Sequence, residues 1–410
     1  MIYPLRIGLG QAESSRRGRR SYKSLMKGRY NGIPPRPHPG APMIALHSDP
    51  RPNALPLTRR ATLLGYVSES GAPDTPSPRE VARRWRAAEA VVLPGLLKDG
   101  VAAHAADIQA AFELMRAVLA SDEPETLFDR GEIQARLLPR FETLAAYRDA
   151  ADCQEIVKVE FDAMEGDQII GENLWCKLSW LSLLEHEQSL RFRFSFGMEG
   201  FEDVAADWQR QQLAADLCEA IFPESAAVSQ HEGLGALMAG ALGVERVAYV
   251  ERIVYFNAPD GGAQFHQDVE RGHAGVVYAQ MSGATFWLTM PKTVLIEQIG
   301  DFLGQPGNEA AMLASMGAAG VETFRRRWSD PVGFKSWFEE EDHAVLDKLL
   351  NRTPEFIRML VERGFASILH PGDVLLLPQA SIEHCNWHTV FCLGDVAGEA
   401  LSFAVRGVEG

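Results

Sequence analysis

The stretch VAYVERIVYFNAPDGGAQFHQDV, residues 247–269, decides the fold. Its first half is rich in β-branched and aromatic residues, which favours a strand over 247–257. Ala258-Pro259-Asp260-Gly261-Gly262 is a turn cluster, and a short polar strand is expected over 265–269. This order of strand, turn and strand is typical of an antiparallel β protein.

Further strands are expected on the C-terminal side of this stretch. Ser282-Gly283 has the composition of a two-residue hairpin turn between two apolar runs. Pro371-Gly372 and Gly394-Asp395 punctuate the last part of the chain. The strands predicted from these signals are 275–281, 284–290, 365–369, 373–378, 384–393 and 400–406. They predict a mainly β core with helices, built as a double-stranded β-helix (jelly roll).

Three segments complete the predicted domain organisation. Residues 1–76 form a basic, disordered N-terminal segment, because 1–60 combine Arg-rich runs with Pro-rich sequence and lack apolar periodicity. Residues 77–152 form a helical layer that begins at Ser77-Pro78, an N-cap followed by proline, and serves as scaffold or as a homodimer surface. Residues 153–410 form the β domain, with a helical insertion at about 298–365.

Composition narrows the classes of function. The chain has 410 residues, of which 46% are hydrophobic and 23% are charged, with a net charge of −15. Such a chain has ample material for a core, and no apolar run is long enough to span a membrane. The acidic charge disfavours nucleic acid as a partner, so we expect a small-molecule substrate and neither nucleic acid nor membrane. A homodimer stays open as an alternative to a monomer. Five cysteines without a CxxC pair suggest a reducing, cytoplasmic setting.

His266-Gln267-Asp268 is the most informative tripeptide. On a strand, residues i and i+2 project from the same face, so the imidazole and the carboxylate would lie side by side. They would supply two of the three ligands of a 2-His-1-carboxylate iron site. A surface His and Asp on a loop edge is the simpler alternative.

The third ligand must come from a distant part of the chain. A Gly-Asp turn and an apolar strand over 372–378 precede His384, which would open the next strand at the mouth of the barrel. His388 shares the face of His384, so either imidazole could serve, and we favour His384. The alternative for His388, which follows Trp387, is a hydrogen-bonded core histidine.

These motifs resemble the Fe(II)/2-oxoglutarate-dependent oxygenases, including their cupin-like JmjC branch, over about residues 247–410. The resemblance rests on the HxD, the hairpin that ends in Phe286-Trp287, the GDVLLLP…H segment and the final strand over 401–406. It implies a double-stranded β-helix and iron ligands at His266, Asp268 and His384. It also implies Fe(II), 2-oxoglutarate as cosubstrate, and O₂.

The chain departs from the family at the basic residue that would pair with the far carboxylate of 2-oxoglutarate. Arg406 is our first choice, although it lies further from the distal histidine than the family pattern places it. Other strand arginines could also point inward: Arg191, Arg193 and Arg252. Thr285 and Ser402 could bind a cosubstrate carboxylate. Residues expected to contact substrate or support the ligands are Gln264, Glu270, Asn386 and His388.

The predicted function is therefore the oxidation of an unactivated C–H bond in a small molecule, such as an amino acid or a natural-product intermediate. Three alternatives stay open: a JmjC-type protein or peptide hydroxylase, a metal-binding cupin without redox chemistry, and a non-catalytic β-barrel. Metal content separates the last from the others, and formation of succinate identifies the oxygenases.

Overall fold

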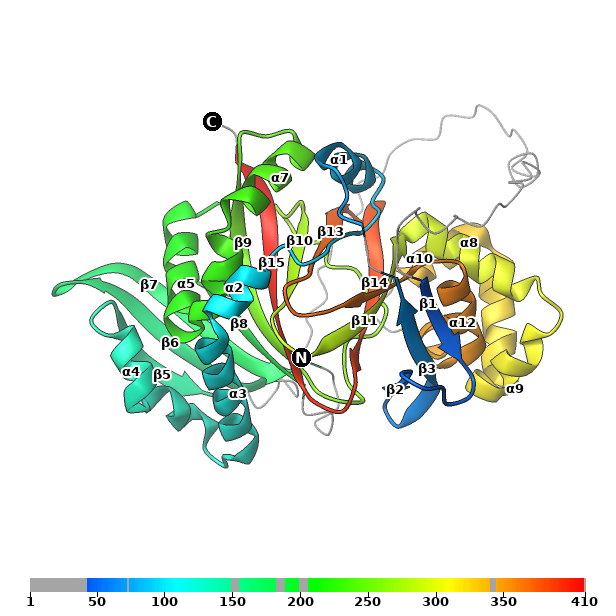
Figure 1. The fold of residues 1–410 in the computed structure, drawn as a ribbon, viewed down its shortest axis with the longest axis horizontal. Coiled ribbons are helices and arrows are strands. Elements are labelled where there is room, and N and C mark those ends of the chain that lie inside the picture. Colours follow the sequence, from blue (N-terminus) through cyan, green and yellow to red (C-terminus); the bar gives the residue numbers. More distant parts are fainter. Residues whose placement is uncertain are drawn as a thin grey trace, which may run out of the picture.

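The computed structural model describes residues 43–71, 74–148, 155–181, 189–198, 206–339 and 344–408. Its architecture is mainly antiparallel β sheet with helices, as the sequence predicts, and Figure 1 shows helices gathered on two sides of the central strands. The N-terminal half comprises β1 (Met43–His47), β2 (Leu55–Arg59), β3 (Thr62–Ser70), α1 (Pro78–Arg86), β4 (Val91–Leu93), α2 (Lys98–Ala103), α3 (Ala105–Ala120), η2 (Pro124–Asp129), α4 (Gly131–Leu137), β5 (Phe141–Tyr147), β6 (Glu155–Glu165), β7 (Gln168–Trp180) and β8 (Leu190–Phe196).

The second half contains the strands that surround the candidate site. It comprises α5 (Trp208–Ile221), η4 (Pro223–Ser225), α6 (Ala226–Ser229), α7 (Glu232–Leu242), β9 (Arg246–Asn257), β10 (Gly275–Gln280), β11 (Ala284–Pro291), α8 (Lys292–Leu303), α9 (Asn308–Trp328), α10 (Pro331–Phe338), α11 (Ala344–Arg352), α12 (Pro354–Glu362), β12 (Ala366–Leu369), β13 (Val374–Ser381), β14 (His384–Leu393) and β15 (Gly398–Val408).

The central strands pair in two groups. In the first, β9, β15, β10 and β13 lie in that order, with β4 on the outer edge of β13. In the second, β12, β11 and β14 lie side by side, and the segment around His266 pairs with β14 through an isolated bridge. The groups meet where β13 pairs with β14 across a bulge. The strand expected over 265–269 is therefore reduced to this single bridge.

Beyond β9, the first group continues through β8, β7, β6 and β5. In β8, Phe192, Phe194 and Phe196 are buried, whereas Arg191 and Arg193 project from the other face. Phe192 packs edge-on against both Phe222 and Phe256. The buried face of this extension therefore fixes it to the helices that follow β8, and the arginine face continues the interior of the β core.

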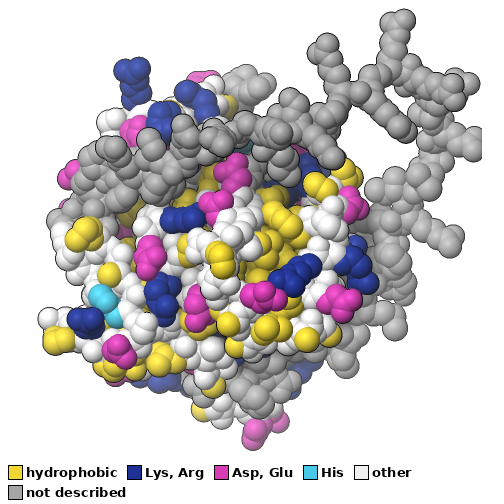
Figure 2. All heavy atoms as spheres, turned by 90° about the vertical axis from the view of Figure 1, so that its right-hand side faces the viewer, with side chains coloured by type: hydrophobic (Ala, Val, Ile, Leu, Met, Phe, Trp, Pro, Cys, Tyr) yellow, Lys and Arg dark blue, Asp and Glu magenta, His cyan; other side chains and the backbone are white. Residues whose placement is uncertain are grey.

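The helical insertion extends from α8 to α12, close to the 298–365 predicted, and packs around a hydrophobic core that it shares with the N-terminal strands, β11 and β14. Its outward face is drawn in Figure 2, where acidic and basic side chains are interspersed among the described residues. Arg325–Glu309 and Arg363–Asp301 are two ion pairs of the insertion, at 2.8 and 2.6 Å. The α8 end of the insertion leads directly from β11 and contributes a wall to the candidate site.

The prediction of disorder over 1–76 is wrong for residues 43–70. They form a three-stranded antiparallel sheet in the order β1–β3–β2, whose Leu57, Leu64 and Val67 are buried against the helical insertion. Apolar alternation in these short strands was obscured by the prolines and arginines between them. Residues 1–42 of the predicted segment lie outside the described residues. The layer expected over 77–152 is helical from α1 to α4, but its described residues also include β4 and β5.

Candidate metal centre

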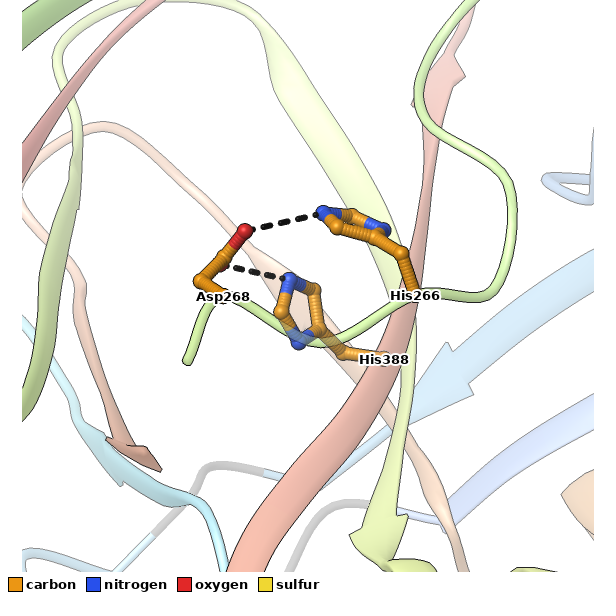
Figure 3. A group of neighbouring side chains, drawn as sticks. All are labelled: His266, Asp268 and His388. Atoms are coloured by element: carbon orange, nitrogen blue, oxygen red, sulfur yellow. Dashed lines mark ion pairs between the residues drawn. The ribbon is translucent and has the colours of Figure 1, made fainter. Parts of the chain in front are cut away.

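His266, Asp268 and His388 converge on one point (Figure 3). His266 Nε2 lies 3.3 Å from Asp268 Oδ1, and His388 Nε2 lies 3.2 Å from Asp268 Oδ2. Two of these residues belong to the segment between β9 and β10, and the third lies in the middle of β14. The expected juxtaposition of His266 and Asp268 with a distal histidine is therefore present.

The distal histidine in this group is His388, which corrects our preference for His384. His384 is exposed at the first position of β14, opposite Ser381. Both histidines have the same strand parity, but four residues of strand separate them by about 13 Å. Only His388 lies level with the HxD segment, because only it pairs with His266.

The orientation of the His266 ring follows from one hydrogen bond. Its Nδ1 lies 2.6 Å from the carbonyl oxygen of Gln264. A carbonyl can only accept, so Nδ1 carries the proton and Nε2 presents its lone pair to the cluster. This is the support that metal-binding histidines commonly receive from a main-chain carbonyl.

The electrostatics of the group favour an ionised carboxylate beside the imidazoles. Burial alone would raise the pKa of Asp268, but His266 and then His388 hold that pKa well below its usual value. Burial opposes protonation of His266, yet Asp268 outweighs it and raises the pKa of His266. Burial, followed by the nearby His266, lowers the pKa of His388. The site thus holds one carboxylate charge between two imidazoles.

The donor set and its spacing fit a divalent transition metal. Metal–ligand distances near 2.1 Å place adjacent ligands of an octahedral ion about 3 Å apart, close to the two separations found here. Two imidazole nitrogens and one carboxylate oxygen on a single face are the donors that suit non-haem Fe(II). A divalent transition metal would be held by His266, Asp268 and His388, which also line a cavity.

That cavity has a volume of about 500 Å³ and is lined by both strand groups and by the helical insertion. Its polar lining outside the triad includes four residues of three strands of the β core, β8, β9 and β15: Arg191, Tyr255, Asn257 and Ser402. Lys292 and Glu339 form a close ion pair on the wall supplied by the insertion. The lining also includes residues whose role the sequence did not reveal: Arg60, Tyr255, Asn257, Tyr278, Trp287 and Lys292. Tyr255 and Asn257 share one face of the strand that the sequence predicts over 247–257, whereas Arg60 and Lys292 carry no local signal.

The other predicted site residues divide into two sets. Gln264 and Ser402 line the cavity. Thr285 is fully buried outside the lining, where its hydroxyl donates to Gln280 and accepts from Trp287 Nε1. Asn386 is also buried outside the lining, and its amide donates to the carbonyl of Ala88. Both side chains support the walls: Thr285 does not line the cavity in which we expected it to bind the cosubstrate, and Asn386 does not line it to contact substrate.

Arg406 and Glu270 also lie outside the cavity lining. Arg406 is four residues beyond Ser402 on β15, about 13 Å further along the strand, and sits opposite Ala248. Glu270 approaches Glu251 and His273 in a second group of candidate ligands. Arg193, however, pairs with Glu251 there and lies 4.0 Å from Glu270, so a guanidinium already offsets part of the negative charge of the group. Arg191 is the strand arginine that the structure places at the cavity.

No family model matches this chain, and no curated protein sequence matches it. Among solved structures, it is similar to a 2OG-Fe(II) oxygenase-family oxidoreductase from Burkholderia pseudomallei, with 10% identity, a TM-score of 0.29, and coverage of 82% of this chain and 94% of that one. It is also similar to YcfD, a ribosomal oxygenase from Escherichia coli, with 14% identity and a TM-score of 0.21. That match covers 67% of this chain and 42% of YcfD, so the chain spans less than half of that neighbour's length. Within the described residues, every helix is too short or too polar to cross a membrane. The structural neighbours are thus 2OG-Fe(II) oxygenases, at identities that do not assign this chain to a family.

Proposed function

We propose that this chain is an Fe(II)/2-oxoglutarate-dependent oxygenase that oxidises an unactivated C–H bond of a small molecule, such as an amino acid or a natural-product intermediate. One observation carries the proposal: two imidazole Nε2 atoms and one carboxylate, from distant parts of the chain, converge at a cavity of about 500 Å³. The bound iron and O₂ would couple C–H oxidation to the conversion of 2-oxoglutarate into succinate and CO₂.

The strand order supports a double-stranded β-helix as the frame of this site. The first group places β9, β15, β10 and β13 side by side, and the second places the His266 segment, β14, β11 and β12 side by side. Consecutive strands from β9 onward thus alternate between the two groups, except that β11 and β12 both belong to the second, as strands do in a jelly roll. This arrangement brings the HxD segment against β14, which is the contact that the site requires.

Arg191 is the residue we assign to the far carboxylate of 2-oxoglutarate. It projects from the arginine face of β8 into the cavity lining, and its Nε donates to Ser179 Oγ at 2.7 Å. That bond leaves the Nη edge of the guanidinium to face a ligand, and a planar Nη pair suits a carboxylate. Ser402 lines the same cavity and would supply a hydroxyl to the cosubstrate. Arg191 therefore takes the role that we expected of Arg406.

The substrate would occupy the side of the cavity nearer the insertion. Trp387 and Phe338 pack against each other to provide an apolar wall there, and Lys292 and Glu339 complete the lining. The aromatic groups would exclude water from the reacting C–H bond, whereas the Lys292–Glu339 pair would orient polar groups of the substrate. This mixture of walls suits a small polar molecule.

Anaerobic titration with Fe(II) and 2-oxoglutarate tests the proposal. We expect the weak visible charge-transfer band of the chelate, and succinate formation once O₂ is admitted. A folded protein that binds the metal but forms neither the band nor succinate would instead be a non-redox cupin. A folded protein that binds no metal would exclude both classes of enzyme.

A further inference from the structure

Arg59 belongs to the N-terminal sheet but lies buried beside the strand that carries His388. The residue is 3% exposed, and its guanidinium carbon lies 3.7 Å from the centroid of the Phe391 ring. Its Nη1 donates to Asn351 Oδ1 at 3.2 Å and to Thr389 Oγ1 at 2.9 Å, and its Nη2 donates to the carbonyl of Val390. A buried arginine with this many directed contacts is fixed in position, because each Nη atom already has an acceptor.

The acceptors of Arg59 adjoin both candidate histidine ligands. Thr389 and Val390 directly follow His388 in β14. Asn351 Oδ1 also accepts from the backbone N–H of Phe265, at 2.9 Å, and Phe265 directly precedes His266. The guanidinium and one amide oxygen therefore join the two histidine-bearing segments.

Thr389 adds a second link between these segments. While its hydroxyl oxygen accepts from Arg59, its hydroxyl hydrogen is donated to the carbonyl of Ala263, at 2.8 Å. Ala263 lies three residues before His266. The network thus binds the segment that precedes His266 at two points, the carbonyl of Ala263 and the backbone N–H of Phe265.

The turn that follows Arg59 is hydrogen-bonded to Asp260, in the same segment before His266. Arg60 and Ala61 adopt φ values of +49° and +59°, in the left-handed region that residues with a Cβ seldom occupy. Asp260 holds the turn there, since its carbonyl accepts from Arg60 N at 3.2 Å and its carboxylate from Ala61 N at 2.6 Å. Strained backbone of this kind persists where surrounding contacts fix it, and it is concentrated near functional sites.

We propose that Arg59 is a positioning residue of the metal centre, which holds the segments of His266 and His388 at the separation that the metal requires. The inference rests on the proposed function, because it assigns Arg59 a role toward that metal. It gives the N-terminal sheet a part in the site, although no residue of that sheet supplies a metal ligand.

The test is an anaerobic Co(II) titration of the full chain, read by ligand-field absorption and accompanied by thermal unfolding. The variants are Arg59→Met, which removes the charge and the two Nη donors of the guanidinium, and Arg59→Lys, which keeps the charge but lacks the planar guanidinium. Arg252→Met is the matched control, since Arg252 is also buried, donates to Glu219 and lies 5.0 Å from the centroid of Phe403, away from the triad.

We expect both Arg59 variants to bind Co(II) about 10- to 100-fold more weakly and with an altered spectrum, as supporting residues of metal sites do. Arg252→Met should lower the unfolding temperature and keep the wild-type affinity and spectrum. If Arg59→Lys keeps the wild-type Co(II) affinity and spectrum, the positive charge matters rather than the planar guanidinium with its directed hydrogen bonds. The positioning role is then overturned.

A second variant keeps the test informative if the Arg59 variants fail to fold. Asn351→Ala removes the oxygen shared by Arg59 and Phe265 N, and it should weaken Co(II) binding in the same direction. Wild-type affinity and spectrum in Asn351→Ala and in any folded Arg59 variant would overturn the inference while leaving the proposed function intact. Failure of the wild-type chain to bind Co(II) would overturn both.

Discussion

The backbones of His266 and His388 exchange two hydrogen bonds, His266 N to His388 O at 2.9 Å and His388 N to His266 O at 3.0 Å. Their rings consequently lie with centroids 4.3 Å apart. The pairing is local in space but distant in sequence, and it selects His388 rather than His384 as the partner of Asp268.

Replacing His388 should abolish metal binding, whereas replacing His384 should not. His388→Ala removes one of three candidate ligands, and His384→Ala is the matched control because that side chain is exposed at the end of the same strand. Isothermal titration with Co(II) under anaerobic conditions measures both. Equal loss of affinity in the two variants would contradict the assignment.

Arg191→Met should raise the half-saturating concentration of 2-oxoglutarate by about 10- to 100-fold. A hydrogen bond to a charged group contributes about 1.5–3 kcal/mol, and about 1.4 kcal/mol corresponds to a factor of ten. Metal affinity should be unchanged, since Arg191 is not a ligand. Arg406→Met, outside the cavity lining, is the control and should leave the half-saturating concentration unaltered; the reverse result would restore Arg406 as the anchor.

Gly262→Ala should destabilise the fold and weaken metal binding together. Gly262 has φ +115°, and an added Cβ would lie 2.2 Å from the carbonyl oxygen of Val390, in the strand that carries His388. The combined strain and overlap should cost about 3 kcal/mol of unfolding free energy. Gly166→Ala isolates the strain, because Gly166 has φ +61° and open space around it, and should cost only about 1–2 kcal/mol. Urea denaturation and Co(II) titration of both variants would reveal whether the overlap matters.

The buried pair Glu224 and Glu399 should make stability fall as the pH rises. Both side chains are 0% exposed. Burial raises the pKa of each, and the adjacent Glu224 raises that of Glu399 further. The folded chain therefore retains protons that an unfolded glutamate loses above about pH 4.3, and stability is lost from there upward.

Glu399→Gln should remove most of this loss and stabilise the chain by about 1–2 kcal/mol at pH 8. The amide can also donate to Glu224. Below about pH 4 the stabilisation should disappear, because the wild-type pair is then protonated in both states. Glu165→Gln, at an exposed position, is the control. If the free energy of unfolding of Glu399→Gln and of the wild type changes by the same amount between pH 4 and 8, the pair is not the cause of the pH dependence.

Local patterns in the sequence were enough to identify the helix that starts at Ser77, whose hydroxyl accepts from Glu80 N at 3.3 Å, and the alternation of Phe192 and Phe194 with Arg191. The same two-residue period places His266 and Asp268 on one side of the chain. These features depend on neighbours a few residues away, so the chain carries their signal directly.

Tertiary structure alone decided which histidine meets that pair and which strand arginine lines the cavity beside it. The two-residue period shows from which face of a strand a side chain projects, but not which residues of the neighbouring strand it lies opposite. That is set by the register of pairing with a strand distant in the sequence. His384 and His388 have equal parity, as do Ser402 and Arg406, and only pairing separates them. Arg59 lies beside the site for the same reason: its contacts are with residues hundreds of positions away, which no local pattern encodes.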